Sequence, residues 1–140
     1  SIYGPQTTDG KPSRRILNKL LNIIHANREV SIVGSGDYFR NYIHVQDAIG
    51  IILELIETEQ ALPEVVLACS TENVKFYEAI TCLVDCYERR FNCEVKINYG
   101  MDARYVSDTR SFYGSPSKCI SKRVFKYDLR GGFNDLVSRI

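Results

Sequence analysis

The amino-acid sequence predicts an α/β fold, with a small, mostly parallel set of strands and with helices packed around them. Two kinds of apolar pattern alternate along the chain, in the order helix, strand, helix, strand, helix, strand, helix. No hairpin signal joins neighbouring strands. The chain has 140 residues, of which 44% are hydrophobic and 25% charged, as in ordinary globular domains. We therefore expect one domain over residues 1–140.

The first half of the chain predicts two helices and two strands. Residues 16–27 carry apolar side chains at helical spacing, and residues 30–33 are a short apolar strand that runs into a glycine turn. Residues 42–45 form a second extended segment. Asp47 then occupies the position of a helix N-cap before residues 48–56. Because that helix is apolar nearly all round, we expect it to be buried on more than one side.

The second half predicts a buried strand and a long helix. Residues 65–69 are consecutively apolar, which is typical of a strand inside a sheet. Residues 76–91 form a long amphipathic pattern, and residues 93–99 alternate as a strand. Weaker patterns indicate a short helix over residues 107–113 and a last helix from about Gly132.

Charge and hydropathy exclude two classes of function. Lys plus Arg is 18 and Asp plus Glu is 17, and a net charge of +1 argues against a dedicated nucleic-acid binder. Residues 110–140 hold seven basic and two acidic side chains (+5), and this basic tail is either a polyanion site or a solvated helix face. No apolar run approaches the roughly 18 residues that a membrane span requires. We therefore expect neither a nucleic-acid nor a membrane partner.

The five cysteines cannot all pair within one chain, because their number is odd. No two of them have the Cys-x-x-Cys spacing, and neither His25 nor His44 lies near a cysteine pair. The sequence therefore predicts no metal site. We expect free, mostly buried thiols in a reducing compartment, the cytoplasm.

A glycine turn precedes the most distinctive polar segment. Residues 34–36 read Gly-Ser-Gly, but the dinucleotide-binding fingerprint needs a third glycine where this chain has Phe39. Arg40 follows the turn, and its planar guanidinium is suited to a diphosphate, to which it can donate two hydrogen bonds at once. Alternatively, Arg40 pairs with Asp37 or Asp47 and holds the turn in place. The residues alone do not separate these two interpretations.

Several motifs follow one another in a set order. Residues 3–5 read Tyr-Gly-Pro, the glycine turn occupies residues 34–36, and residues 40–47 read Arg-Asn-Tyr-Ile-His-Val-Gln-Asp. Residues 100–108 read Gly-Met-Asp-Ala-Arg-Tyr-Val-Ser-Asp, and residues 128–133 place a glycine pair at the start of the last helix. Over essentially its whole length, the chain resembles the C-terminal substrate-binding portion of extended short-chain dehydrogenase/reductase enzymes, the NAD-dependent nucleotide-sugar epimerases and dehydratases. The motif at residues 100–108 is similar to that of nucleoside-diphosphate-glucose 4,6-dehydratases.

The resemblance implies a nucleotide-sugar site around the glycine turn. Arg40 is its implied anion ligand, and Tyr42 is expected to pack beside the nucleotide. Arg104 is a second phosphate contact, unless it pairs with Asp102 or Asp108. The implied substrate-binding residues are Ile32 and Val33 at the base, Gly34 in the wall, Arg40, Tyr42 and Arg104.

The chain also departs from the family pattern. Asn41 and Gln46 stand where the family has aspartates, and Asn98 stands where it has a phosphate-binding arginine. None of the nine tyrosines has a lysine four residues later, although the family's chemistry uses a Tyr-x-x-x-Lys pair. The resemblance thus implies no catalytic residue and no cofactor in this chain, with NAD(P) expected only on the N-terminal Rossmann half of a longer parent.

Two functions therefore remain open. In the first, the chain is the nucleotide-sugar-binding fragment of an epimerase or dehydratase and is not catalytic alone. In the second, it is a non-catalytic interaction protein that kept the fold and lost the ligand. Both imply exposed apolar surface, so we expect a homo-oligomer or a missing Rossmann half as partner.

Overall fold

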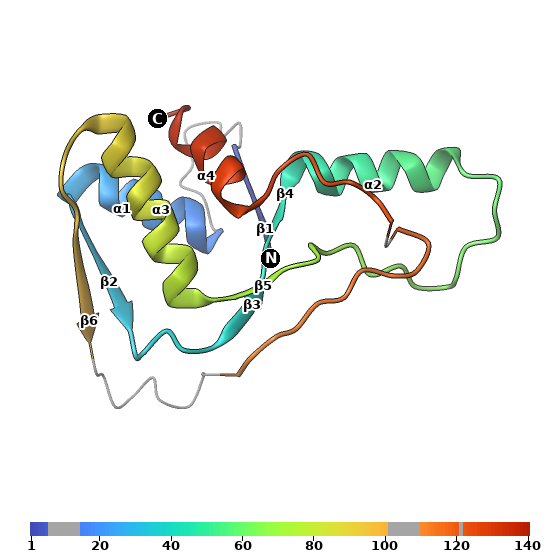
Figure 1. Ribbon diagram of the computed structural model, residues 1–140, viewed down its shortest axis with the longest axis horizontal. Coiled ribbons are helices and arrows are strands. Elements are labelled where there is room, and N and C mark those ends of the chain that lie inside the picture. The colour runs from blue at the N-terminus through green and yellow to red at the C-terminus, as the bar shows by residue number, and fades with distance from the viewer. Residues whose placement is uncertain (6–14, 101–109, 121) are drawn as a thin grey trace.

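The computed structural model describes residues 1–5, 15–100, 110–120 and 122–140. Helices and short strands alternate along these segments (Figure 1), which confirms the predicted α/β fold. In chain order the elements are β1 (Ile2–Tyr3), α1 (Ile16–Asn27), β2 (Glu29–Val33), β3 (Phe39–Asn41), β4 (Ile43–His44), α2 (Val45–Glu57), β5 (Asn73–Lys75), α3 (Phe76–Phe91), β6 (Lys96–Gly100) and α4 (Leu129–Val137).

The strands form two-stranded sheets. β2 pairs with β6 in parallel, from Glu29 opposite Lys96 to Val33 opposite Gly100. β1 and β4 are also parallel, whereas β3 and β5 are antiparallel. Within the described segments the pairing is therefore mostly parallel, as predicted. Each parallel pair is joined by a long connection that includes at least one helix, because parallel strands cannot be linked by a tight turn.

The main core lies between α1, α3, α4 and β2. α1 spans the predicted residues 16–27, and its inward side chains follow the helical spacing read from the sequence. The residue after it, Arg28, has a left-handed backbone (φ 56°) that ends the helix. α3 and α4 close the core from the other side, and Tyr87 and Phe133 are fully buried there. The core side chains of α1 are Leu17, Leu20, Leu21 and Ile24.

α4 begins at Leu129, three residues before the predicted start. Asp128 caps it, since its carboxylate accepts a hydrogen bond from the Gly131 backbone N–H at 2.6 Å. Gly132 is inside the helix, and the ring of Tyr3 packs directly against it, so this position has no room for a side chain. A Cβ at this position would lie 2.0 Å from the Tyr3 Oη atom. The glycine that suggested a helix start therefore marks a close contact.

The prediction of Asp47 as N-cap of α2 is wrong. The helix begins at Val45, and His44 is the cap, with its Nδ1 accepting a hydrogen bond from the Gln46 backbone N–H at 3.3 Å. Asp47 lies within the first turn and is buried. Its two carboxylate oxygens accept hydrogen bonds from the backbone N–H groups of Lys126 and Tyr127, at 2.8 and 3.1 Å. Asp47 thus fixes a distant segment instead of its own helix.

The expectation that α2 is buried on several sides is also wrong. α2 extends away from α1, α3 and the β2–β6 pair (Figure 1). Ile51 and Ala48 pack into a small second core with Ile43 and Ile120. The rest of its apolar surface faces solvent, with Ile56 73% exposed. We call these exposed side chains the α2 face: Ile49, Ile52, Leu53 and Ile56.

Residues 65–69 do not form the predicted buried strand. They have no regular secondary structure, and Val65 and Leu67 are 76% and 51% exposed. A buried apolar strand needs neighbours on both edges, and no strand of the described segments pairs with this one. Of the helix predicted over residues 107–113, residues 107–109 lie outside the described residues, and residues 110–113 are not helical.

Candidate functional site

The guanidinium of Arg40, a residue of β3, lies against two aromatic rings. Its guanidinium carbon lies 4.3 Å from the ring centre of Tyr38 and 4.8 Å from that of Phe112. Tyr38 in turn stacks on Phe76, with ring centres 5.2 Å apart. Stacking restrains the plane of a guanidinium and leaves its edges available for hydrogen bonds. The aromatic neighbours therefore orient Arg40 without neutralising its charge.

The hydrogen bonds of Arg40 leave part of its fork available. Nη1 donates to its neighbour's carbonyl, Phe39 O, at 2.9 Å and to Arg110 O. Within the described part of the chain, Nη2 and Nε have no hydrogen-bond partner. These two donors lie on one edge of the planar guanidinium, which is the arrangement that accepts a carboxylate or phosphate through two oxygens.

The two carboxylates considered as partners of Arg40 are engaged elsewhere. Asp37 forms an ion pair with Lys75 at 2.7 Å, and Asp47 accepts its two backbone hydrogen bonds from residues 126 and 127. No ion pair joins Arg40 to either of them among the described residues. This arrangement favours the interpretation of Arg40 as an anion ligand over its interpretation as a structural ion pair.

An open groove of about 460 Å3 lies beside Arg40. Phe112 and Tyr113 form part of its wall and are 61% and 67% exposed. Exposed aromatic faces next to a guanidinium can stack a flat ring while the cation holds an attached anion. The rest of the wall includes Ile43, Leu67, Ala68 and Cys69. The groove therefore offers aromatic, cationic and apolar surface together.

Asn41 connects the segments that form this groove. Its Nδ2 atom donates to Ser70 O at 2.8 Å, to Glu72 O at 3.0 Å and to Asn73 Oδ1 at 3.2 Å. Its Oδ1 accepts from the Ser70 backbone N–H at 2.9 Å. Asn73 extends the network to Gly114 through two further hydrogen bonds. The departure from the family's aspartate at this position thus has a structural role, because a carboxylate cannot donate these bonds.

The other implied site residues that the structure describes do not line the groove beside Arg40. Ile32 and Tyr42 are 1% and 5% exposed and belong to the main core, and burial raises the pKa of Tyr42. Val33 is on the opposite face of β2 and is 46% exposed. Gly34 has a positive φ of 75°, and its N–H donates to Gly100 O at 2.8 Å. Arg104 lies outside the described residues, so its implied phosphate contact stays a prediction.

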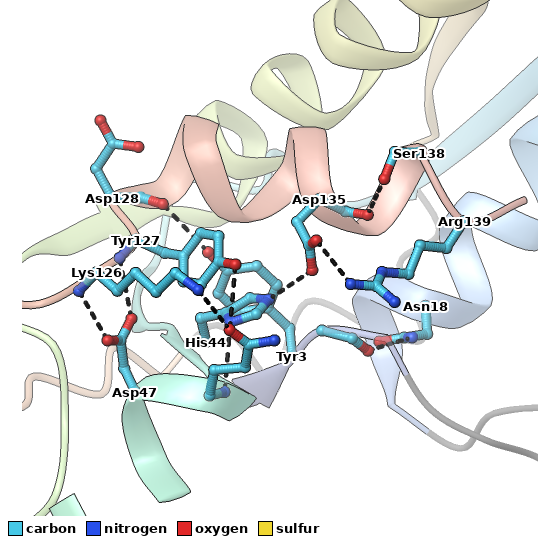
Figure 2. A network of polar contacts seen from close by, with 12 residues as sticks. Tyr3, Asn18, His44, Asp47, Lys126, Tyr127, Asp128, Asp135, Ser138 and Arg139 are labelled. Carbon is cyan, nitrogen blue, oxygen red and sulfur yellow. Dashed lines mark hydrogen bonds and ion pairs between the residues drawn. The ribbon is translucent and has the colours of Figure 1, made fainter. Parts of the chain in front are cut away.

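A second polar cluster surrounds His44, where the end of β4 meets α4 (Figure 2). His44 is 1% exposed, and its Nε2 lies 3.4 Å from Asp135 Oδ2 on α4. Its ring packs against Tyr127 at 4.0 Å and against Tyr3 at 5.4 Å between ring centres. Burial lowers the pKa of His44, while Asp135 and Asp47 oppose that shift. The cluster joins β4 to α4 and lies apart from the Arg40 groove.

Sequence reasoning missed the aromatic wall of the groove. Phe112 and Tyr113 follow Arg40 by about 70 positions and lie outside any helix or strand, so no periodic pattern marks them. Two adjacent aromatic residues in an irregular segment were the available signal. The backbone N–H of Phe112 donates to Phe39 O at 2.9 Å, and this contact brings the segment to β3.

Comparisons with known proteins find a family match over part of the chain and similar folds over almost all of it. Residues 1–69 match the model of the NAD dependent epimerase/dehydratase family. No curated protein matches the chain. Solved structures of epimerases and dehydratases have a similar fold over almost all of it.

Three of these structures illustrate the similarity. UDP-glucuronic acid 4-epimerase from Bacillus cereus is 14% identical, with a TM-score of 0.70, over 99% of this chain and 41% of that one. dTDP-glucose 4,6-dehydratase from Bacillus anthracis is 17% identical, with a TM-score of 0.70 and the same two coverages, 99% and 41%. UDP-N-acetylglucosamine 4-epimerase from Methanobrevibacter ruminantium is 16% identical, with a TM-score of 0.68, over 99% and 44%. The chain thus spans less than half the length of the structures that it resembles.

The glycine turn at residues 34–36 does not have the geometry of a dinucleotide-binding loop. Dinucleotide loops of the epimerase/dehydratase type lead into a helix whose free N–H groups meet the phosphates. Here the glycine turn leads into β3, and Gly34 already donates its N–H to Gly100.

In the described segments no three His, Cys, Asp or Glu side chains gather to hold a metal ion, and no helix is long and apolar enough to cross a membrane.

Proposed function

We propose that this chain is the nucleotide-sugar-binding fragment of a NAD-dependent epimerase/dehydratase and does not catalyse the reaction alone. The observation that carries the proposal is the arrangement of Arg40, with two donors on one edge that have no partner among the described residues, beside a groove with an exposed aromatic wall. The family match over residues 1–69 and the similar epimerase and dehydratase structures support it.

In this proposal the nucleoside diphosphate occupies the groove. Nη2 and Nε of Arg40 donate to oxygens of the diphosphate, and the base stacks against Phe112 or Tyr113. The buried clamp of Asn41 holds both walls at a fixed separation, which lowers the entropy lost on binding. Hydride transfer needs the nicotinamide cofactor, which we assign to a Rossmann half outside this chain, together with the Tyr-x-x-x-Lys pair.

Calorimetric titration with UDP-glucose, dTDP-glucose and GDP-mannose tests the proposal. We expect binding of at least one ligand, weakened roughly tenfold to a hundredfold in Arg40→Ala, because charge-assisted hydrogen bonds contribute about 1.5–3 kcal/mol. Arg40→Lys should bind with intermediate affinity, since an ammonium lacks the planar fork. Arg90→Ala removes an exposed positive charge on α3 and is the matched control. Failure of all three ligands to bind at millimolar concentration would contradict the proposal for this chain.

The exposed side chains of the α2 face support the proposal of a protein partner in addition to the ligand. β4 pairs with β1 in parallel and leads directly into α2, which is the beginning of a βαβ unit. Parallel sheets are covered on both faces, yet Ile2 is 48% exposed here and the α2 face is open. We propose that the Rossmann half, which would supply further parallel strands, covers this face.

A second copy of the chain is the alternative cover, and it would make the protein an oligomerisation module without a ligand. The two alternatives differ in stoichiometry, because self-assembly on one face gives a closed dimer.

The five free cysteines agree with a reducing compartment, and we propose the cytoplasm.

A further inference from the structure

Residues 110–114, which we call the strap, lie beside β3 and form part of the groove wall. The Phe112 backbone N–H donates to Phe39 O at 2.9 Å, and the Phe39 N–H donates to Ser111 Oγ at 3.1 Å. Both backbone polar groups of Phe39 are therefore bound by the strap. A strand edge offers such groups to a neighbouring strand, and here an irregular segment takes the place of that strand.

The C-terminal end of the strap is firmly held. Gly114 and the side chain of Asn73 exchange two hydrogen bonds, at 2.8 and 3.0 Å. A Cβ at Gly114 would lie 3.0 Å from both Asn41 Cγ and Cys69 Sγ, so the backbone is closely packed at this point. Because Asn41 also holds the opposite wall of the groove, this end of the strap is fixed relative to that wall.

The other end of the strap is held by Arg40. Its Nη1 donates to Arg110 O, and its guanidinium carbon lies 4.8 Å from the ring centre of Phe112. One side chain thus contributes a charge-assisted hydrogen bond and a cation–π contact. The Nη2 and Nε donors of the same guanidinium have no partner among the described residues. Arg40 therefore holds the strap with one part of its fork while the other part can bind an anion.

The strap buries little apolar surface against β3. Phe112 and Tyr113 stay mostly exposed, although their rings contact Arg40 and Phe39. Segments with few buried contacts and with solvent-exposed hydrogen bonds open at a low cost in free energy. The contacts of Arg40 are therefore a large part of what keeps the strap in place.

We propose that the strap closes the groove, with Gly114 as its fixed end and Arg40 as its latch, and that binding of a diphosphate stabilises the closed position. The inference rests on the proposed function for the identity of the anion. Two anion oxygens bound to Nη2 and Nε fix the plane of the guanidinium, which restrains Nη1 at Arg110 O and the guanidinium face at Phe112. Anion binding and closure then favour each other. The Phe112 ring thus strengthens anion binding without touching the diphosphate.

Residue-resolved hydrogen exchange, measured by NMR on the whole chain, tests the latch. We expect the Phe112 amide to exchange about tenfold faster in Arg40→Ala, because the charge-assisted hydrogen bond and the ring contact are both lost. In the unchanged chain, millimolar pyrophosphate should slow this exchange several-fold relative to sodium chloride of equal ionic strength, and in Arg40→Ala it should not. Arg90→Ala, which removes an exposed cation from α3, should behave like the unchanged chain. The amides of α3 report whether each variant is folded.

Phe112→Leu separates the latch from direct contact with the ligand. This variant loses the ring but keeps the backbone bond to Phe39, and pyrophosphate has no base that could stack on the ring. We expect faster exchange of the residue 112 amide and several-fold weaker pyrophosphate binding by calorimetric titration, since an open strap leaves Arg40 unrestrained. Phe112→Tyr keeps the ring and should restore both. Tyr99→Leu removes an exposed ring from β6 and should change neither.

The outcomes separate this inference from the proposed function. Nucleotide sugars that bind the chain without slowing the exchange of Phe112 would overturn the strap and leave the proposed function in place. Protection by pyrophosphate in a chain that binds none of the three nucleotide sugars would support the strap and overturn the proposed function. Unchanged exchange in both Arg40→Ala and Phe112→Leu would show that Arg40 is not a latch.

Discussion

His44 Nε2 lies 3.4 Å from Asp135 Oδ2, and this contact joins the end of β4 to α4. The histidine also caps α2 through its Nδ1, so the proton of the neutral ring resides on Nε2, the ring nitrogen closest to Asp135 (Figure 2). Although Asp135 favours the charged ring, burial outweighs it and lowers the pKa of His44. The folded protein therefore holds His44 in its neutral form.

The neutral state of His44 makes stability depend on pH. Because the unfolded chain binds a proton near pH 6.5 and the folded chain does so only at lower pH, the contribution of His44 is present above pH 6.5. It is lost as the pH falls below 6.5 through the lowered pKa, by at most about 1.4 kcal/mol per pH unit. Urea unfolding between pH 7.5 and 5 measures this slope. His44→Gln should reduce the slope. An unchanged slope in His44→Gln would refute the assignment.

Asn41 should tolerate substitution poorly, although a family aspartate is only one atom different. Asn41→Asp places a carboxylate oxygen against the three oxygens that now accept from Nδ2. We expect a loss of about 1–3 kcal/mol in the free energy of unfolding, measured by chemical denaturation at pH 7. Asn22→Asp, on the exposed surface of α1, is the matched control and should change stability by less than about 0.5 kcal/mol. Equal effects of the two substitutions would mean that the clamp is not needed.

Two glycines in helices should respond in opposite ways to alanine. At Gly132 a Cβ would lie 2.0 Å from the Oη atom of Tyr3, a ring that is 2% exposed and cannot move away. Gly132→Ala should destabilise the protein by about 1–3 kcal/mol despite the higher helix propensity of alanine. At Gly50 the nearest atom is the flexible end of Arg123, so Gly50→Ala should be neutral or stabilising by up to about 1 kcal/mol. Thermal unfolding of both variants gives the comparison, and a stable Gly132→Ala would contradict the described packing.

The α2 face should make the isolated chain associate with itself. We expect light scattering to show a mean mass that grows with concentration and has no fixed stoichiometry, because the face lacks its cover. The double variant Ile52→Asp and Ile56→Asp should restore a monomer, whereas Val33→Asp, an exposed apolar position on β2, should not. A closed dimer abolished by the double variant would instead favour the second copy as partner, and a monomeric wild-type chain would contradict both.

Elements that depend on a local pattern could be predicted from the amino-acid sequence. α1 begins and ends where its apolar spacing and the residues after it predict, and α3 likewise occupies Phe76–Phe91. The glycine turn and Arg40 were identified because their residue types have specific conformations and donors. For such features the information lies within a few neighbouring positions, so a reading along the chain recovers it.

Tertiary structure decided which side chains meet. Asp47 has the residue type of a cap, but the backbone of residues 126 and 127 lies closer to its carboxylate, and His44 takes the capping position instead. Residues 65–69 are apolar enough for a strand but find no strand to pair with in the described segments. Arg40 and Phe112 meet across 72 positions of sequence, at a contact that no local pattern encodes. These outcomes depend on competition between partners distant in the chain, and only the folded arrangement settles that competition.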